Sequence, residues 1–140
     1  MFFGTARFRG ACLDTDYIVR SNEDVVVIRI GLESPMVDRS LSRFNARSAV
    51  FITASDPLSS RRGNIVNQSA HRDLKSDLKR RKAHFLEGEG RGTDGNRPPK
   101  RSVLAFGVPR DAAASLRHRF RHNAVVFVRY GNKAEFLMLR

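Results

Sequence analysis

The stretch that decides the fold runs from Ser48 to Asn67 and reads SAVFITASDPLSSRRGNIVN. Its first part, residues 48–54, is an apolar run of the kind that forms a buried strand. Asp56-Pro57 ends the strand, because proline lacks a backbone N–H and restricts the residue before it to extended conformations. A polar, basic loop then leads into a helical pattern. This order is typical of the edge at which sheets flanked by helices bind ligands.

Outside this stretch, strand patterns and helical patterns alternate along the 140-residue chain. Strand patterns occupy residues 17–20, 25–30, 103–108, 124–129 and 134–139, with a weaker one near 84–87, and helical patterns begin at Pro35, near Asn64 and at Pro109. Because helices separate the strands, we expect partly parallel pairing. The pattern predicts an α/β or α+β fold, a single domain in which about three helices flank a mixed β-sheet. Residues 1–15 are predicted to be a poorly ordered segment and residues 16–140 the domain.

Two local expectations refine this fold. Val25 to Ile28 form a continuous apolar run, which is typical of a strand covered on both faces. Gly88 to Lys100 is rich in glycine and proline and is therefore predicted to be a loop.

The strongest candidate for chemistry is the loop and first helical turn that follow the 48–54 strand. Serine hydroxyls, arginine guanidinium groups and the unpaired N–H groups of a helix N-terminus all suit a phosphate or a carboxylate. We therefore predict a site for a small anionic ligand, joined by an asparagine at the start of a neighbouring strand. The predicted ligand-binding residues are Asp56, Ser59, Ser60, Arg61, Arg62, Asn64, Asn67 and Asn123.

The charge of the chain supports a second function. The formal net charge is +12, from 26 Lys+Arg against 14 Asp+Glu, which favours an anionic partner such as nucleic acid. The helix expected from about Asn64 has an inward stripe that includes Val66, Leu74 and Leu78. Its basic part, residues 71–84, crowds cations on the other side. Such a run is either a solvated helix face or a surface that binds nucleic acid without sequence specificity. The residues of this alternative interface are Lys75, Lys79, Arg80 and Lys82.

An enzyme is the third alternative. Glu87 and Glu89 are two residues apart, so in an extended segment they would share a face and could serve as acid and base, with Asp56 as a further carboxylate. His118 and His122 have helical ligand spacing, but arginines surround them and no third ligand is apparent, so neither a metal nor a cofactor is predicted.

The cellular setting follows from what the chain contains. Cys12 is the single cysteine, so no internal disulfide can form, which fits a reducing cytoplasm. The longest apolar run, Ala124 to Val128, is far too short to cross a bilayer, and no membrane partner is expected.

Four short motifs follow one another between about residues 17 and 139. They are Arg29-Ile30-Gly31 with Ser34-Pro35, residues 46–54 with Asp56-Pro57, residues 87–91 (EGEGR) and residues 123–127 (NAVVF). In these motifs the chain resembles the bacterial DUF3293 family, a domain of unknown function. The resemblance implies a small, stand-alone bacterial domain of mixed α/β type. It implies no activity, because the family has none assigned.

The chain also departs from the family pattern at three places, Ser55-Asp56, Lys100-Arg101 and Arg121-His122. Family members tend to have an aromatic residue with Asn at the first place, an acidic residue at the second and Gly-Gln at the third. Each departure adds a charge. If these positions form a shared site, this chain has altered it.

Overall fold

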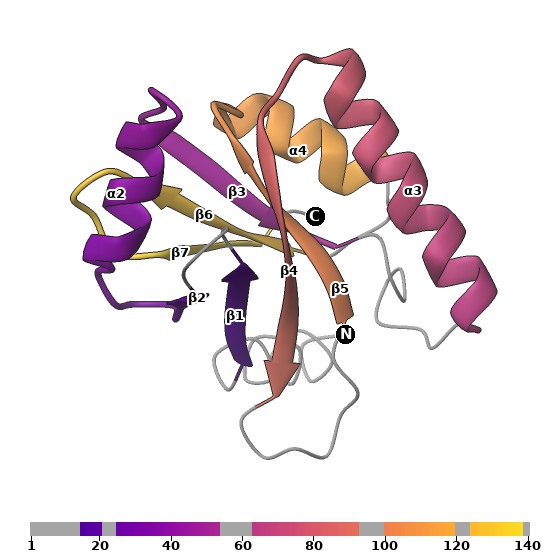
Figure 1. Ribbon diagram of the computed structural model, residues 1–140, viewed down its shortest axis with the longest axis horizontal. Coiled ribbons are helices and arrows are strands. Elements are labelled where there is room, and N and C mark those ends of the chain that lie inside the picture. Colours follow the sequence, from indigo (N-terminus) through magenta and orange to yellow (C-terminus); the bar gives the residue numbers. More distant parts are fainter. Residues whose placement is uncertain (1–14, 21–24, 54–62, 93–99, 120–123, 139–140) are drawn as a thin grey trace.

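The structure, a computed structural model, describes residues 15–20, 25–53, 63–92, 100–119 and 124–138. Within them one seven-stranded sheet has the order β2-β1-β4-β5-β3-β6-β7, and helices pack on both of its faces (Figure 1). The strands are β1 (Thr15–Arg20), β2 (Val25–Ile28), β3 (Ser48–Ile52), β4 (Phe85–Gly92), β5 (Lys100–Phe106), β6 (Ala124–Arg129) and β7 (Glu135–Met138). The helices are α2 (Pro35–Arg43), α3 (Asn64–Arg80) and α4 (Arg110–Arg119).

The predicted single domain with helices flanking a sheet is confirmed, in its α+β form. Every named pair of neighbouring strands is antiparallel, so the expected partly parallel pairing is wrong. The reason lies in the connections. Each described helix joins two strands that are not neighbours in the sheet, so no helix makes the crossover between adjacent parallel strands.

The sheet curls until the segments beyond its two edge strands meet. A parallel bridge joins Ile30 to Ala134, and the backbone N–H of Gly31 donates a hydrogen bond of 2.9 Å to the Ala134 carbonyl oxygen. Tyr17 on β1 and Phe51 on β3 meet edge to face, with ring centroids 5.1 Å apart, although β4 and β5 separate their strands in the sheet. The face that carries these two rings is therefore the inner face of the curl.

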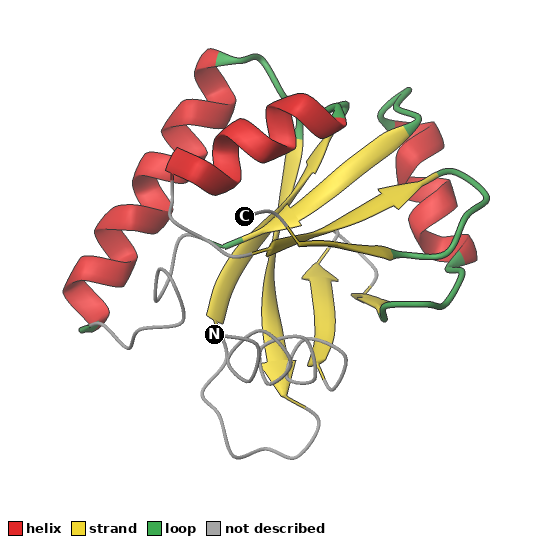
Figure 2. Cartoon of the chain, turned by 180° about the vertical axis from the view of Figure 1, so that it is seen from behind, coloured by secondary structure: helices red, strands yellow, loops and turns green. Residues whose placement is uncertain are grey.

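Two apolar cores lie on opposite faces of the sheet. On the inner face, α2 buries Val37 and Leu41 against side chains of β1, β2, β3, β5 and β6. On the outer face, Leu74 and Leu78 of α3 and Ala113 of α4 pack on β3, β5 and β6 (Figure 2). The helix predicted to begin at Pro35 is confirmed, and the Ser34 side chain caps it by accepting a hydrogen bond from the Val37 N–H.

The predicted loop from Gly88 is wrong at its start, because β4 continues to Gly92. Gly88 and Gly90 pair with Val19 and Tyr17 of β1, so they occupy the inner face. A Cβ atom at Gly88 would collide with the carbonyl oxygen of Ile18, and only glycine fits there. Gly88 thus occupies a crowded strand position, and Glu87 and Glu89, which alternate with the glycines, occupy the outer face.

Candidate functional site

The outer face of the sheet is open over β1, β2 and the far part of β4. The outer-face core draws its strand residues from β3, β5 and β6, with Phe85 at the near end of β4 packed against it. On β2, Val25 and Val27 are 53% and 45% exposed, so the prediction that this strand is covered on both faces is wrong. Charged side chains of β1, β4 and β5 share this open face.

Glu87 is the centre of a charged cluster on the open face. Its Oε1 atom accepts a hydrogen bond of 3.0 Å from Nε2 of His71 on α3. The same oxygen lies 3.5 Å from Nζ of Lys75, also on α3, and 3.4 Å from a guanidinium nitrogen of Arg101 on β5. The Glu87 side chain is half exposed, so the cluster joins α3 to the sheet and presents a carboxylate at the surface.

His71 is buried beneath this carboxylate. Burial lowers the pKa of His71 below its usual 6.5, and the hydrogen bond from the imidazole lowers the pKa of Glu87 below 4.5. The pair near neutral pH is therefore a neutral imidazole, donating its Nε2 proton, and an ionised carboxylate. Among the described residues nothing bonds to Nδ1 of His71, a further reason for the ring to stay neutral. His71 thus orients Glu87 without adding a charge to the face.

Glu89 is held in the same way at the next outward position of β4. Arg20 of β1 donates to Oε1 at 2.9 Å, and Arg91 donates to Oε2 at 3.0 Å. The hydrogen bond from Arg20 is the main cause that lowers the pKa of Glu89. Glu89 therefore stays ionised and keeps two exposed arginines in place.

This arrangement bears on the acid–base alternative. Because β4 is extended, Glu87 and Glu89 share one face, roughly 7 Å apart along the strand. Both pKa values are lowered, so both carboxylates suit ion pairing better than proton donation at neutral pH. No group of three or more His, Cys, Asp or Glu side chains within the described ranges could hold a metal ion.

The basic helix is shorter than predicted, since α3 ends at Arg80. Lys75 contacts Glu87, Arg80 contacts Asp77 at 3.2 Å, and Lys79 is exposed. Lys82 lies past the helix with φ +56°, a left-handed conformation uncommon for lysine. The structure therefore divides the predicted interface: Arg80 pairs with an aspartate on its own helix, whereas Lys75 faces the open sheet.

Most of the predicted anion site lies outside the described residues. This is the case for Asp56, Ser59, Ser60, Arg61, Arg62 and Asn123. Asn64 opens α3, and Asn67 is partly buried in the first turn, where its N–H donates to the Gly63 carbonyl oxygen at 3.0 Å. The loop starts after Thr53, whose hydroxyl donates to the Arg101 carbonyl oxygen at 2.7 Å. Thr53, the last described residue before the loop, therefore lies beside the Glu87 cluster.

Sequence reasoning missed His71, Arg20 and Arg101 as parts of this site. A signal existed for His71, because it precedes Leu74 and Leu78 at helical spacing on the buried stripe. None existed for the arginines, because their partners depend on β4 lying between β1 and β5.

The part of the chain that the structure describes has no helix long and apolar enough to cross a membrane. Neither a search of curated proteins nor a search of solved structures finds a match. A family model, described as protein of unknown function (DUF3293), matches residues 52–125, just over half of the chain. The matched segment includes α3, β4 and β5, and with them the Glu87 cluster. The chain therefore belongs to the DUF3293 family.

Proposed function

We propose that this protein binds the phosphate backbone of a nucleic acid along α3 and the adjoining open face of the sheet. The observation that carries the proposal is the placement of Lys75 and Arg101, one on α3 and one on β5, around the same carboxylate. This contact makes the basic stripe of the helix and the arginines of the sheet one continuous surface.

The stripe on α3 consists of Arg72, Lys75 and Lys79, which helical spacing places on one side of the helix. Arg20, Arg91 and Arg101 lie across the open face, with side chains that are 58%, 53% and 60% exposed. Cations outnumber the two glutamates on this surface, and the net charge of the chain has the same sign. The glutamates hold the arginines in fixed directions, which lowers the entropy lost when a phosphate binds.

This surface suits recognition of the backbone and not of bases. The exposed apolar residues described on the open face, Val25 and Val27, are aliphatic, so they offer bases no aromatic ring to stack on, and the arginines there are held edge-on by the glutamates in ion pairs. Binding is therefore expected to be independent of sequence and to weaken steeply with salt, because each phosphate contact releases counterions.

The test is charge reversal on the stripe. Arg72→Glu combined with Lys79→Glu should weaken binding to duplex DNA at low salt at least tenfold. The slope of log K against the logarithm of the salt concentration should decrease by the contribution of about two phosphate contacts. Lys75 is left unchanged, because a glutamate there would face Glu87 and disturb the cluster. Arg39→Glu combined with Lys133→Glu is the matched control.

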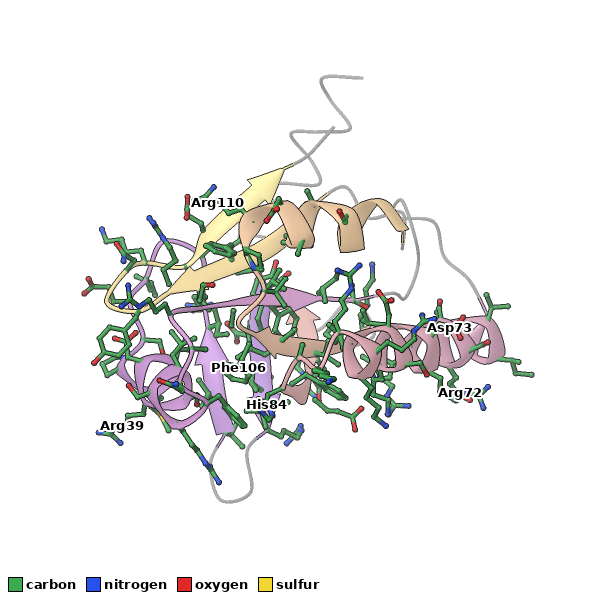
Figure 3. All side chains as sticks on the ribbon, turned by 90° about the horizontal axis from the view of Figure 1, so that it is seen from above. Arg39, Arg72, Asp73, His84, Phe106 and Arg110 are labelled. Atoms are coloured by element: carbon green, nitrogen blue, oxygen red, sulfur yellow. The ribbon has the colours of Figure 1, made fainter. Side chains whose placement is uncertain are left out.

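Arg39 lies on α2, at the opposite side of the molecule from Arg72 (Figure 3). Lys133 follows the turn in which the Gly131 N–H donates to Asp38 of α2. This control makes the same change in net charge away from the stripe. Equal losses in both double variants would show that only net charge matters and would overturn the proposed surface.

A second candidate is a small anion at the N-terminus of α3, bound by the predicted residues between Asp56 and Asn67. It is supported by Gly63 at the N-cap, which offers no side-chain hydrogen bond, and by a first turn without an acidic residue. Phosphate should then shift the amide resonances of the first turn, and Arg61→Ala with Arg62→Ala should abolish the shift. A compact site of this kind would lose little affinity with salt. Either function fits a bacterial, cytoplasmic protein.

A further inference from the structure

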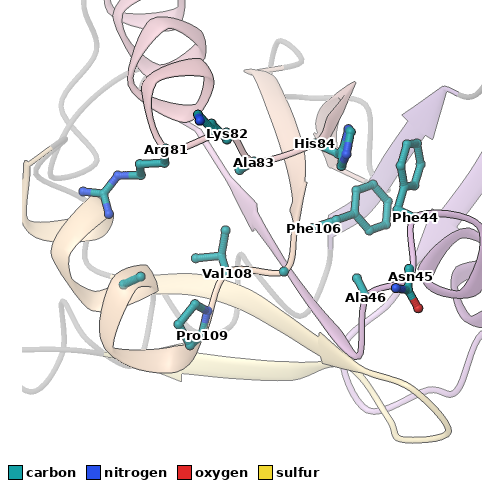
Figure 4. Close-up of a pocket in the computed structure, with 12 residues that line it drawn as sticks. Phe44, Asn45, Ala46, Arg81, Lys82, Ala83, His84, Phe106, Val108 and Pro109 are labelled. Atoms are coloured by element: carbon teal, nitrogen blue, oxygen red, sulfur yellow. The ribbon is translucent and has the colours of Figure 1, made fainter.

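A hollow lies at the C-terminal end of α3. It is an open depression of about 350 Å³, where α2 and α3 end, β5 leaves the sheet and α4 begins (Figure 4). Volumes of this size are typical of sites for small molecules. Besides small and aliphatic residues, its lining contains three chemical groups: aromatic rings, an amide and cations.

The aromatic group is a row of rings along one wall. Phe44 stacks on Phe106, with ring centroids 4.5 Å apart. The ring of His84 also contacts Phe44, with ring centroids 5.4 Å apart. Phe106 is buried and Phe44 half-buried, whereas His84 is exposed. Figure 4 shows the three side chains together at one side of the depression. Such a wall suits a planar ring as a ligand.

The amide and one cation sit on strained backbone. Asn45 and Lys82 are the described non-glycine residues with positive φ, +52° and +56°, and both line the depression. Each follows the C-terminus of a helix in the same hydrogen-bonded cap: the Ala46 N–H donates to the Leu41 carbonyl oxygen, and the Ala83 N–H to that of Leu78. Glycine would occupy either position with less strain. Asparagine tolerates this conformation, whereas lysine seldom adopts it. The side chain kept at Lys82 therefore needs another explanation, which a ligand supplies.

The charge on the rim is positive. Arg81 and Lys82 line the depression, and no carboxylate is found among its lining residues. The Arg81 guanidinium also lies 3.4 Å from a carboxylate oxygen of Asp77 on α3, so Lys82 is the main cation of the rim. Pro109 and Ala112 bring the first turn of α4, the positive end of that helix, to the same place. The C-terminal ends of α2 and α3 carry partial negative charge and would repel an anion. This repulsion is reduced, because carbonyl groups of their last turns accept the capping hydrogen bonds.

We propose that this depression binds a nucleotide unit, with its base against the ring wall, its base edge at Asn45 and its phosphate at Lys82 and Arg81. The three groups match the three parts of such a ligand: a flat ring, polar ring edges and an anion. The unit can be a free nucleotide or one nucleotide of a single strand. The site uses other residues than the stripe of α3, so neither proposal depends on the other.

The experiment titrates the whole chain with 5′-AMP, adenosine and inorganic phosphate, following amide resonances by NMR. We expect 5′-AMP to bind at least tenfold more tightly than either fragment and to shift Asn45, Lys82 and His84. A pentanucleotide of adenylate distinguishes the two sources: tighter binding than 5′-AMP at the same resonances indicates a strand. Binding of 5′-AMP no tighter than that of phosphate would overturn the proposal.

Two variants test the base position and the phosphate position separately. Neither should unfold the protein, because glycine adopts a positive φ without strain. Lys82→Gly should weaken 5′-AMP binding about five- to tenfold and leave adenosine unchanged. Asn45→Gly should weaken both to the same extent. Lys79→Ala, one turn before the depression, is the control: it should reduce DNA binding along α3 and leave 5′-AMP unaffected. An unchanged affinity of Lys82→Gly for 5′-AMP would refute the phosphate position.

Discussion

The two halves of the sheet differ in how many of their faces are covered. In β3 and β5, the residues from Ala49 to Ile52 and from Ser102 to Phe106 are all buried, because α2 lies on one face and α3 with α4 on the other. In β1 and β2, buried residues alternate with less buried ones, because only the inner face is covered. The covered half stabilises the fold, and the open half presents charged side chains to solvent.

The difference shows that an apolar run in the sequence does not by itself predict whether helices cover both faces of a strand. Val25 to Ile28 is as apolar as Ala49 to Ile52, yet Val25 and Val27 are exposed. Valine favours extended backbone and is compatible with a half-buried strand, so it occurs there even on the solvent side. Coverage is decided by where the helices pack, and α3 covers the outer face only as far as the Glu87 cluster.

The largest expected contrast compares the outer face of the two halves. Leu78→Ala, in the outer-face core, should lower the free energy of unfolding by about 2–5 kcal/mol. Val27→Ala, on the open half, should change it by roughly 0.5 kcal/mol or less. Urea unfolding of both variants measures the difference. Equal losses would mean that β2 is covered on its outer face in solution.

The next contrast lies within β4. Gly88→Ala should destabilise the protein by about 1–3 kcal/mol, because the added methyl group meets the backbone of Ile18. Gly90→Ala is the matched control two residues away, where a Cβ atom would be in ordinary contact with Thr15 at 3.7 Å. Its effect should stay within about 0.5 kcal/mol. If the two alanine variants are equally stable, β1 and β4 are not packed as closely as described.

A smaller effect is expected at the border between the halves, from the titration of His71. Its pKa is lowered in the folded state, so the unfolded chain binds a proton first as the pH falls. His71 therefore does not reduce the free energy of unfolding above pH 6.5. Below pH 6.5 the free energy of unfolding falls, by at most about 1.4 kcal/mol per pH unit. His71→Gln should remove this part of the decline. Urea midpoints at pH 7.5 and pH 5.5 test it, and identical pH dependence in both proteins would contradict a neutral buried imidazole.

The smallest effect concerns the open half itself. Arg20→Ala removes an exposed ion pair with Glu89 and should cost about 0.2–1 kcal/mol. The pKa of Glu89 should rise toward its usual value, since the hydrogen bond from Arg20 is the main cause of its lowering. NMR titration of the carboxyl carbon measures this shift. An unchanged pKa would mean that Arg91 alone orients the carboxylate.

Much of the fold could be predicted from the sequence because it is encoded locally. The apolar runs of β3, β5 and β6, the Ser34-Pro35 start of α2 and the stripe of Leu74 and Leu78 all follow from periodicity and capping. The strands expected at 48–54, 103–108 and 124–129 do lie side by side.

The pairing of distant strands could not be predicted in this way. The register that places Arg20 beside Glu89, and Arg101 near Glu87, depends on β4 lying between β1 and β5. Glycines at 88 and 90 indicate a loop unless this close packing is known. Val66 was expected to face inward but is 49% exposed, because the first turns of α3 extend beyond the sheet (Figure 1).

The strand order has a consequence for the time course of folding. Three neighbouring pairs, β1 with β2, β4 with β5 and β6 with β7, are consecutive in the chain and can form early as separate hairpins. The remaining joins, β1 with β4 and β3 with β5 and β6, connect segments that lie far apart along the chain. Closing long loops costs entropy before any contact is gained. The docking of the β4–β5 and β6–β7 hairpins onto β3, and of the β1–β2 hairpin onto β4, should therefore limit the rate. Folding in milliseconds to seconds, and not in microseconds, is the expected result.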